Sequence, residues 1–187
     1  MATADITVRG AGIFGLSIAW VLTQRGARVL VIDPHGLGAG ASGGIVGALA
    51  PHVPENWNPK KQFQLESLLM AEAFWAEGEA AGGASPGYAR TGRCQPIADD
   101  AALAHARQRS ETAKALWGDA ATWTVRPIAN PNWSANSPTG MEIFDTLSAR
   151  VHPRQACEAL AAALKAQGVN IQAEGADTAI TIHATGV

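Results

Sequence analysis

The sequence has 187 residues, of which 47% are hydrophobic and 16% are charged, and its net charge at pH 7 is -2. This length allows one ordinary domain or slightly more, and the composition excludes a disordered chain. The charge gives no positive field that would recruit nucleic acid, so we expect no nucleic-acid partner. No apolar run reaches the roughly 20 residues that a membrane helix needs, so we expect no membrane span. Two cysteines far apart favour a reduced, cytoplasmic protein.

A strand, a turn and a helix are predicted at the start of the chain. Residues 6–9 indicate a short strand, and residues 13–25 have the apolar spacing of a helix, which Gly26 ends. Residues 28–33 are a largely β-branched, apolar run, typical of a parallel strand covered on both faces. Together they form one βαβ unit, for which we expect a right-handed connection.

The turn after the first strand carries the glycine spacing GxGxxG as "GAGIFG", residues 10–15. Gly10 permits the tight turn, Gly12 lets the backbone approach a diphosphate, and Gly15 lets the helix pack close to the sheet. The start of the helix, at Ile13 and Phe14, offers N–H groups and a partial positive charge to the anion. The spacing therefore predicts a dinucleotide site rather than a glycine turn of purely structural origin.

Two residues beside this turn bear on the same prediction. Asp33 ends the second strand 18 residues after Gly15, where its carboxylate is placed to accept hydrogen bonds from a ribose. We assign Asp33 and the following Pro34 to the cofactor site. Arg9 departs from the pattern, because the residue before the first glycine is normally small or apolar. Its guanidinium either reaches solvent or a carboxylate, or it contacts the diphosphate, and the sequence leaves both interpretations open.

The rest of the chain mixes strands and helices without the regular alternation of strand and helix that is typical of a parallel sheet. A glycine-rich loop without charged residues covers 36–51. The later predicted elements are a helix at 60–81, a strand at 92–98, a helix from Asp99 to Gly118, strands at 122–128 and 141–145, a helix from Pro153 to Gly168, and strands at 169–172 and 178–184. This order predicts an α/β fold: a Rossmann-like layer interrupted by an inserted α+β segment.

The loop "GAGASGGIVGALAP", residues 38–51, follows the acidic residue closely. With GxGxxG and Asp33, it resembles the flavoprotein family of D-amino-acid oxidase, glycine oxidase and sarcosine oxidase. Members carry a loop of small residues with a serine near its middle and a glycine shortly after it. The resemblance implies FAD as the cofactor. It implies phosphate contacts at Ser42, Gly43 and Gly44, and backbone beside the flavin at Gly47, Ala48 and Leu49.

Later segments resemble the same family. Residues 91–98 are similar to a strand of its substrate domain, and residues 151–171 to its return into the FAD domain. Residues 181–187 are similar to a closing strand, with Ala184 and Gly186 letting the backbone approach the cofactor and His183 where an apolar residue is usual. The resemblance implies a first part of the FAD-binding domain at 1–85, a partial substrate domain at 86–145, and a return segment at 146–187.

Members of the family continue into further segments, which supply an arginine and a tyrosine for the substrate carboxylate. We therefore expect this chain to be the N-terminal portion of such an enzyme. The resemblance implies an oxidoreductase that transfers hydride from a C–H bond next to an amine nitrogen to flavin N5, with a small-molecule amine or amino acid as substrate. It names no catalytic residue here and leaves the electron acceptor and the oligomeric state open.

Three other functions stay open at this point. A tRNA-modifying oxidoreductase has a flavin domain with a similar glycine-rich stretch. A nucleotide-binding remnant without activity fits the early end of the sequence. An NAD dehydrogenase fits less well, because the loop around Ser42 has no purpose there.

The remaining chemistry-bearing residues indicate no second site. His35 and His105 lack metal-ligand spacing, so the sequence predicts no metal. His52 is interpreted as a non-covalent neighbour of the flavin or a surface histidine. Cys94 and Cys157 have apolar neighbours and are predicted to be buried thiols.

Overall fold

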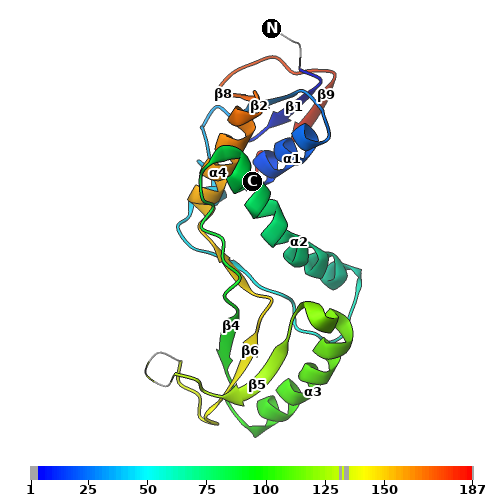
Figure 1. The fold of residues 1–187 in the computed structure, drawn as a ribbon, viewed down its shortest axis with the longest axis vertical. Helices are drawn as coiled ribbons and strands as arrows, with labels where there is room; N and C mark the ends of the chain where they lie inside the picture. The colour runs from blue at the N-terminus through cyan, green and yellow to red at the C-terminus, as the bar shows by residue number, and fades with distance from the viewer. Residues whose placement is uncertain (1–3, 131, 133–134, 187) are drawn as a thin grey trace. The chain divides into compact units, whose positions relative to one another are not determined.

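The computed structural model describes residues 4–130, 132 and 135–186, which form two compact units. The first unit comprises Met1–Gly47, Ala73–Tyr88 and Val151–Val187, and the second comprises Ala48–Glu72 and Ala89–Arg150 (Figure 1). Helix α2 (Pro59–Gly82) contributes residues to both. The assignment of these parts to a cofactor domain and a substrate domain stays a prediction.

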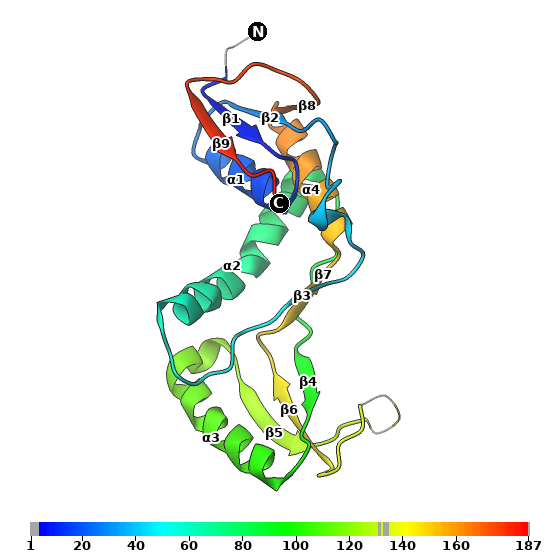
Figure 2. The ribbon, with the colours of Figure 1, turned by 180° about the vertical axis from the view of Figure 1, so that it is seen from behind.

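The first unit is built on a four-stranded sheet with the strand order β8-β2-β1-β9 (Figure 2). The strands are β1 (Ile6–Arg9), β2 (Val29–Ile32), β8 (Asn170–Gln172) and β9 (Ile180–His183), and every pairing is parallel. Since the strands are parallel, their carboxyl ends lie at one edge of the sheet. The chain leaves that edge at Gly10, Asp33 and Ala184, which is the edge where open α/β sheets bind ligands.

Helices α1 (Ile13–Gln24) and α4 (Pro153–Ala166) pack against each other in the first unit. Leu16 and Trp20 of α1 and Leu160 and Leu164 of α4 are buried. The end of α2 crosses α4 closely, because a Cβ on Gly82 would lie 2.4 Å from the backbone N of Ala163. The predicted βαβ unit and the α/β class are confirmed, with the ends of α1 and β2 within one residue of the prediction.

The second unit has an antiparallel sheet of order β4-β6-β5, formed by β4 (Arg93–Pro96), β5 (Trp123–Pro127) and β6 (Met141–Asp145). Helix α3 (Asp100–Trp117) is followed by a 3-10 turn, Gly118–Ala120. Asp99 caps α3 by accepting the N–H of Ala102 at 2.7 Å. Trp117 and Trp123 meet edge to face in the core, with ring centroids 6.0 Å apart.

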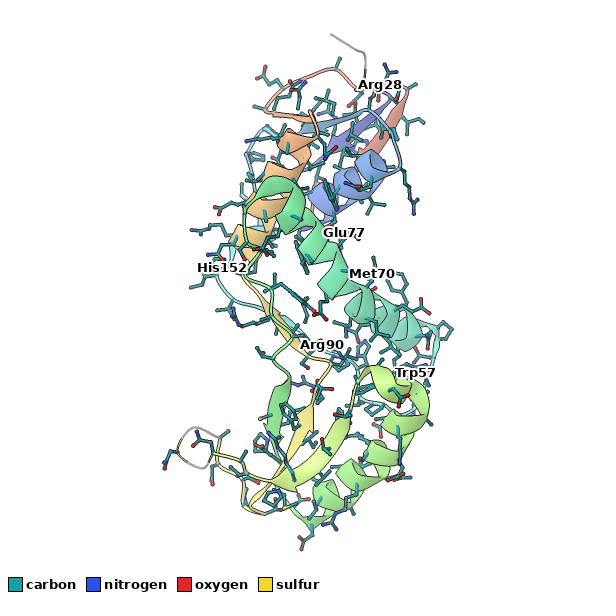
Figure 3. All side chains as sticks on the ribbon, viewed as in Figure 1. Arg28, Trp57, Met70, Glu77, Arg90 and His152 are labelled. Carbon is teal, nitrogen blue, oxygen red and sulfur yellow. The ribbon has the colours of Figure 1, made fainter. Side chains whose placement is uncertain are left out.

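The part of α2 that belongs to the second unit has one buried and one exposed apolar face. Leu65 and Leu68 lie in the core of that unit. Phe63 and Met70 are 71% and 57% exposed. Met70 is labelled on α2 in Figure 3. None of the helices in the described stretches is long and apolar enough to cross a membrane.

The two cysteines have different environments. Cys157 on α4 is buried, as the sequence predicts. Cys94 is exposed, so the prediction of a buried thiol there was wrong. Side chains alternate along a strand, and the neighbouring positions on β4, Arg93 and Gln95, are half-buried. Cys94 pairs with Phe144 in register on the opposite face of the sheet, where Arg126 Nη2 donates to its sulfur at 3.7 Å.

Besides the 3-10 turn after α3, three short elements of the described residues have no counterpart in the sequence analysis. They are the 3-10 turn η1 (Ala41–Gly43) and the paired strands β3 (Gly47–Leu49) and β7 (Ala149–Val151). A strand of three residues is too short to show an alternating pattern of apolar side chains, so the sequence pattern does not predict it.

Candidate functional site

The glycine turn after β1 brings three backbone segments into contact. Gly10 has φ +114°, and a Cβ there would lie 2.2 Å from the carbonyl oxygen of Ala184 at the end of β9. A Cβ on Gly15 would lie 1.9 Å from the carbonyl oxygen of Gly10. Ala184 also donates its N–H to the carbonyl oxygen of Arg9 at 2.7 Å. Side chains are excluded at both glycines, so the turn is bare backbone at the carboxyl edge of the sheet.

The loop that contains Ser42 lies against the start of α1. Ser42 Oγ accepts the N–H of Ile13, the first residue of the helix, at 3.0 Å. Gly12 occupies the N-cap position, and a Cβ there would lie 3.1 Å from the same oxygen. Gly38 donates its N–H to the carbonyl oxygen of Ala11 at 2.9 Å. The two glycine-rich stretches that the sequence singles out therefore face each other in the first unit.

Helix α4 donates two hydrogen bonds to this loop. The Arg154 guanidinium donates to the carbonyl oxygen of Gly43 at 2.9 Å, and the Arg154 N–H donates to that of Gly44 at 3.2 Å. Gly43 also packs on the loop itself, because a Cβ there would lie 2.6 Å from the carbonyl oxygen of Gly38. Arg154 is a residue that sequence reasoning missed, since a basic residue in the first turn of a helix has no distinctive signal.

The carboxylate of Asp33 is fixed by two backbone groups. One oxygen accepts the N–H of Ala11 at 2.7 Å, and the other accepts the N–H of His35 at 2.9 Å. Each carboxylate oxygen has further lone pairs, so both remain able to accept from a ligand hydroxyl. The position of this side chain is set by the turn that it closes.

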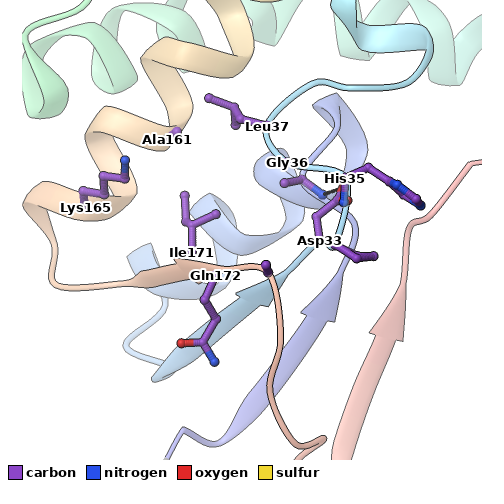
Figure 4. Close-up of a pocket in the computed structure, with 11 residues that line it drawn as sticks. Asp33, His35, Gly36, Leu37, Ala161, Lys165, Ile171 and Gln172 are labelled. Carbon is purple, nitrogen blue, oxygen red and sulfur yellow. Dashed lines mark hydrogen bonds between the residues drawn. The ribbon is translucent and has the colours of Figure 1, made fainter.

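Two cavities flank Asp33. One, of about 410 Å³, is lined by Arg9, Gly10, Ile32, Asp33, Pro34, His35, Ala39, Gly40 and Thr185. The other, of about 380 Å³, lies between the segment after β2, helix α4 and strand β8 (Figure 4). It is lined by Asp33 and the four residues that follow it, with Lys165 from α4 and Gln172 from β8 among the rest. Asp33 and Pro34 thus border both hollows at the edge of the sheet.

The other predicted site residues in the first unit lie at the start of α1, beside α4 and in the segment after β9. Phe14 is 77% exposed at the start of α1. Gly47 lies against α4, because a Cβ there would be 3.1 Å from Pro153 Cγ. Gly186 has φ +75° in the segment after β9. Ala48 and Leu49 belong to β3 in the second unit, so their part in the site stays a prediction.

Arg9 reaches a carboxylate, which was one of the two interpretations of this residue. Its Nε donates to Asp177 Oδ1 at 2.7 Å, and its Nη2 donates to the carbonyl oxygen of Gly175 at 3.4 Å. Thr178 is held nearby, since its N–H donates to Thr7 Oγ1 at 3.0 Å. The short connection between β8 and β9 is therefore tied to β1 by polar contacts. His183, the register partner of Arg9 on β9, is exposed.

These features fit the diphosphate and ribose of a dinucleotide. The turn and the loop offer backbone that a single Cβ would obstruct at Gly10 and Gly43. The first turn of α1, which lies wholly within the described residues, holds no acidic side chain to repel an anion. The Ser42 hydroxyl lies at the positive end of that helix, and the Asp33 carboxylate lies at the adjoining strand end.

Solved structures share this fold. The chain is similar to glycine oxidase from Geobacillus kaustophilus, with a TM-score of 0.77 and 16% identity over 98% of this chain and 55% of that one. It is also similar to L-amino acid deaminase from Proteus myxofaciens, with a TM-score of 0.76 and 22% identity over 100% of this chain and 46% of that one. The chain therefore spans about half the length of these proteins.

Curated relatives include a longer, bifunctional protein. The tRNA 5-methylaminomethyl-2-thiouridine biosynthesis bifunctional protein MnmC from Ralstonia nicotianae is 32% identical over 157 residues, which are 83% of this chain and 23% of that protein. The protein of the same name from Maricaulis maris is 34% identical over 70 residues, which are 37% of this chain and 12% of that protein. These matches cover only a minor part of each relative.

The match to a protein family extends over almost the whole chain. Residues 5–187 match the family DAO, described as "FAD dependent oxidoreductase". The matched range contains the glycine turn, the Ser42 loop, Asp33 and the strand β9 that closes on Gly10. This chain belongs to the DAO family of FAD-dependent oxidoreductases.

Proposed function

We propose that this chain holds FAD along the carboxyl edge of the sheet in its first unit and takes part in oxidising a small amine or amino acid. The observation that carries the proposal is the contact between Ser42 Oγ and the N–H of Ile13. It joins the loop that distinguishes this flavoprotein family to the glycine turn that many dinucleotide-binding folds share. A diphosphate at this junction meets bare backbone, a hydroxyl and a helix N-terminus.

Each group has a separate role in binding. The backbone at Gly10 and Gly12 lets the diphosphate approach the turn, and Ser42, Gly43 and Gly44 enclose it from the loop. Asp33 accepts hydrogen bonds from the ribose hydroxyls, which explains why its carboxylate is held rigidly by Ala11 and His35. The second hollow beside Asp33, between α4 and β8, accommodates the base.

The redox chemistry belongs to the cofactor. When bound, FAD accepts the hydride equivalent released from a C–H bond next to an amine nitrogen. The residues of this chain bind and orient, and no catalytic acid or base is assigned to them. The substrate class rests on the names of the structural neighbours, an oxidase of glycine and a deaminase of L-amino acids. The cytoplasmic location stays a prediction.

One observation favours a second candidate function. The MnmC protein from Ralstonia nicotianae is 32% identical over 157 residues, so a flavin-dependent step in tRNA modification is the alternative. The net charge of -2 counts against an RNA surface on this chain.

A substrate panel on the purified, FAD-loaded protein separates the two candidates. We expect anaerobic bleaching of the flavin absorption by at least one of glycine, D-amino acids, L-amino acids, L-proline or iminodiacetate. Bleaching by a modified tRNA but by none of the amino compounds would transfer the proposal to the second candidate. Bound FAD that no compound reduces would leave a binding protein and refute the oxidation step.

A further inference from the structure

The 3-10 turn that carries Ser42 is held by hydrogen bonds rather than by packing. None of its three residues, Ala41–Gly43, is buried. Ser42 Oγ accepts the N–H of Ile13 at the start of α1. The end of the turn accepts hydrogen bonds from Arg154 on α4. The position of Ser42 therefore depends on polar contacts with two different helices.

Arg154 binds two consecutive carbonyl groups at the end of this turn. Its guanidinium donates to the carbonyl oxygen of Gly43 at 2.9 Å, and its backbone N–H donates to that of Gly44 at 3.2 Å. The last carbonyl groups of a helical turn have no partner within the turn, so they need an outside donor. None of the ion pairs that the described residues form involves Arg154, so no carboxylate among them competes with the loop for its guanidinium.

The glycine content of the loop explains why such an outside donor matters. Four of the seven residues from 38 to 44 are glycine. Glycine has the most backbone freedom to lose, so this segment costs more entropy to order than a segment of other residues. Contacts that are already formed in the free protein reduce the part of this cost that falls on ligand binding. A donor fixed to α4 thus prepares the turn for a ligand.

We propose that Arg154 is a positioning residue, which holds the 3-10 turn so that Ser42 meets the cofactor diphosphate in a fixed arrangement. Arg154 acts through the loop, because both of its donors are directed to loop carbonyl groups. The inference rests on the proposed function, since it assumes that the Ser42 loop contacts FAD. It adds a residue of α4 to a site otherwise built from the segments that follow β1 and β2.

Replacements of Arg154 test the role of its side-chain donor. Arg154→Met keeps a long side chain without a donor, and Arg154→Lys keeps a donor. We expect Arg154→Met to raise the FAD dissociation constant about threefold to tenfold, as the loss of one hydrogen bond predicts, and Arg154→Lys to stay within about twofold of the unmodified protein. Arg25→Met, which changes an exposed arginine at the end of α1, is the control and should bind FAD normally.

The dissociation constant is measured by quenching of flavin fluorescence on titration with apoprotein. Weaker binding in Arg154→Met that Arg154→Lys restores supports the inference. Normal binding in Arg154→Met, or binding in Arg154→Lys that is as weak as in Arg154→Met, overturns it.

A double-mutant cycle with Ser42→Ala tests whether Arg154 acts through the turn. If it does, Arg154→Met has a smaller effect on the FAD dissociation constant in the Ser42→Ala background than in the unmodified protein. Equal effects in both backgrounds would show that Arg154 does not act through Ser42 and would overturn the inference. Urea unfolding of each apoprotein identifies folding defects. If Arg154→Met does not fold, Arg154→Gln takes its place in the cycle with the same two outcomes.

The same variants distinguish this failure from failure of the proposed function. If Ser42→Ala alone leaves FAD binding unchanged, the diphosphate contact at Ser42 is wrong, and the inference falls with it. If Ser42→Ala weakens FAD binding while Arg154→Met binds FAD as well as Arg25→Met does, only the role of Arg154 is refuted.

Discussion

The carboxylate of Asp33 accepts the backbone N–H of Ala11 at 2.7 Å and thereby joins the end of β2 to the glycine turn after β1. The other carboxylate oxygen is held by the N–H of His35. The acceptor that we propose for a ribose is thus in place before a ligand arrives, and the entropy cost of ordering it on binding is small.

Replacement of Asp33 is expected to weaken FAD binding more than it weakens the fold. Asp33→Ala removes the proposed ribose contacts and both backbone hydrogen bonds, and we expect the FAD dissociation constant to rise at least about tenfold, with a loss of about 1–3 kcal/mol in unfolding free energy. Asp33→Asn keeps one acceptor oxygen, so its FAD dissociation constant should lie between those of the unmodified protein and Asp33→Ala. Unchanged FAD affinity in Asp33→Ala would contradict a ribose contact.

Two glycines of the same loop provide a matched pair. A Cβ on Gly43 would lie 2.6 Å from the carbonyl oxygen of Gly38, whereas a Cβ on Gly40, at φ -91°, would meet no described atom within 4 Å. We expect Gly43→Ala to cost about 1–3 kcal/mol by displacing the loop, and to weaken FAD accordingly. Gly40→Ala should bind FAD normally. Equal FAD affinities for the two variants, measured by titration, would show that the shape of the loop does not matter.

Replacement of Arg9 tests which of its two interpretations applies when the cofactor is bound. The ion pair with Asp177 is partly exposed, at 30% and 46% for the two side chains, so Arg9→Leu should cost less than about 1 kcal/mol of stability. If the guanidinium only forms the ion pair with Asp177, Arg9→Leu and Asp177→Asn should change the FAD affinity by the same small factor. A large loss of affinity in Arg9→Leu alone would instead place the guanidinium on the diphosphate.

Glu55 in the second unit gives a pH-dependent prediction. The Arg109 guanidinium, with a smaller effect from the hydrogen bond of His105, lowers the pKa of Glu55 from 4.5 to about 2. Because the pKa is lower in the folded state, the stabilisation is complete above pH 4.5 and is lost as the pH falls towards 2. Since these side chains are partly exposed, we expect a contribution of about 1 kcal/mol.

Urea unfolding of Glu55→Gln checks this expectation. The variant should be less stable than the unmodified protein at neutral pH, and the difference should shrink as the pH falls below 4.5. Glu111→Gln, which changes an exposed carboxylate on α3, is the control and should track the unmodified protein. A difference that stays constant down to pH 2 would show that Glu55 acts through packing rather than charge.

The parts of the fold that the sequence predicts well are those with a strong local cause. Gly10 and Gly15 sit where no Cβ fits, and Asp99 and Pro153 begin helices as their residue types favour. The exposure of Cys94 was mispredicted because apolar neighbours in sequence do not determine which face of a strand a side chain takes. That depends on the register with Phe144, which only the pairing of the strands reveals.

The residues that hold the predicted site groups in place could not be predicted from the sequence, for a related reason. Ser42 accepts the N–H of Ile13, 29 residues earlier, and Arg154 on α4 donates to the carbonyl oxygen of Gly43, 111 residues earlier. Neither contact leaves a periodic or spaced pattern. The sequence indicates the groups that we propose to touch a cofactor, while the residues that hold those groups emerge from the packing of α4 against the loop.

The most direct test of the central claim is the flavin content of the purified protein and its titration with FAD. We expect FAD to bind in a one-to-one ratio, with flavin fluorescence quenched on binding, and both effects to weaken in Ser42→Ala and Asp33→Ala. A folded protein that neither carries FAD nor quenches its fluorescence would contradict the account.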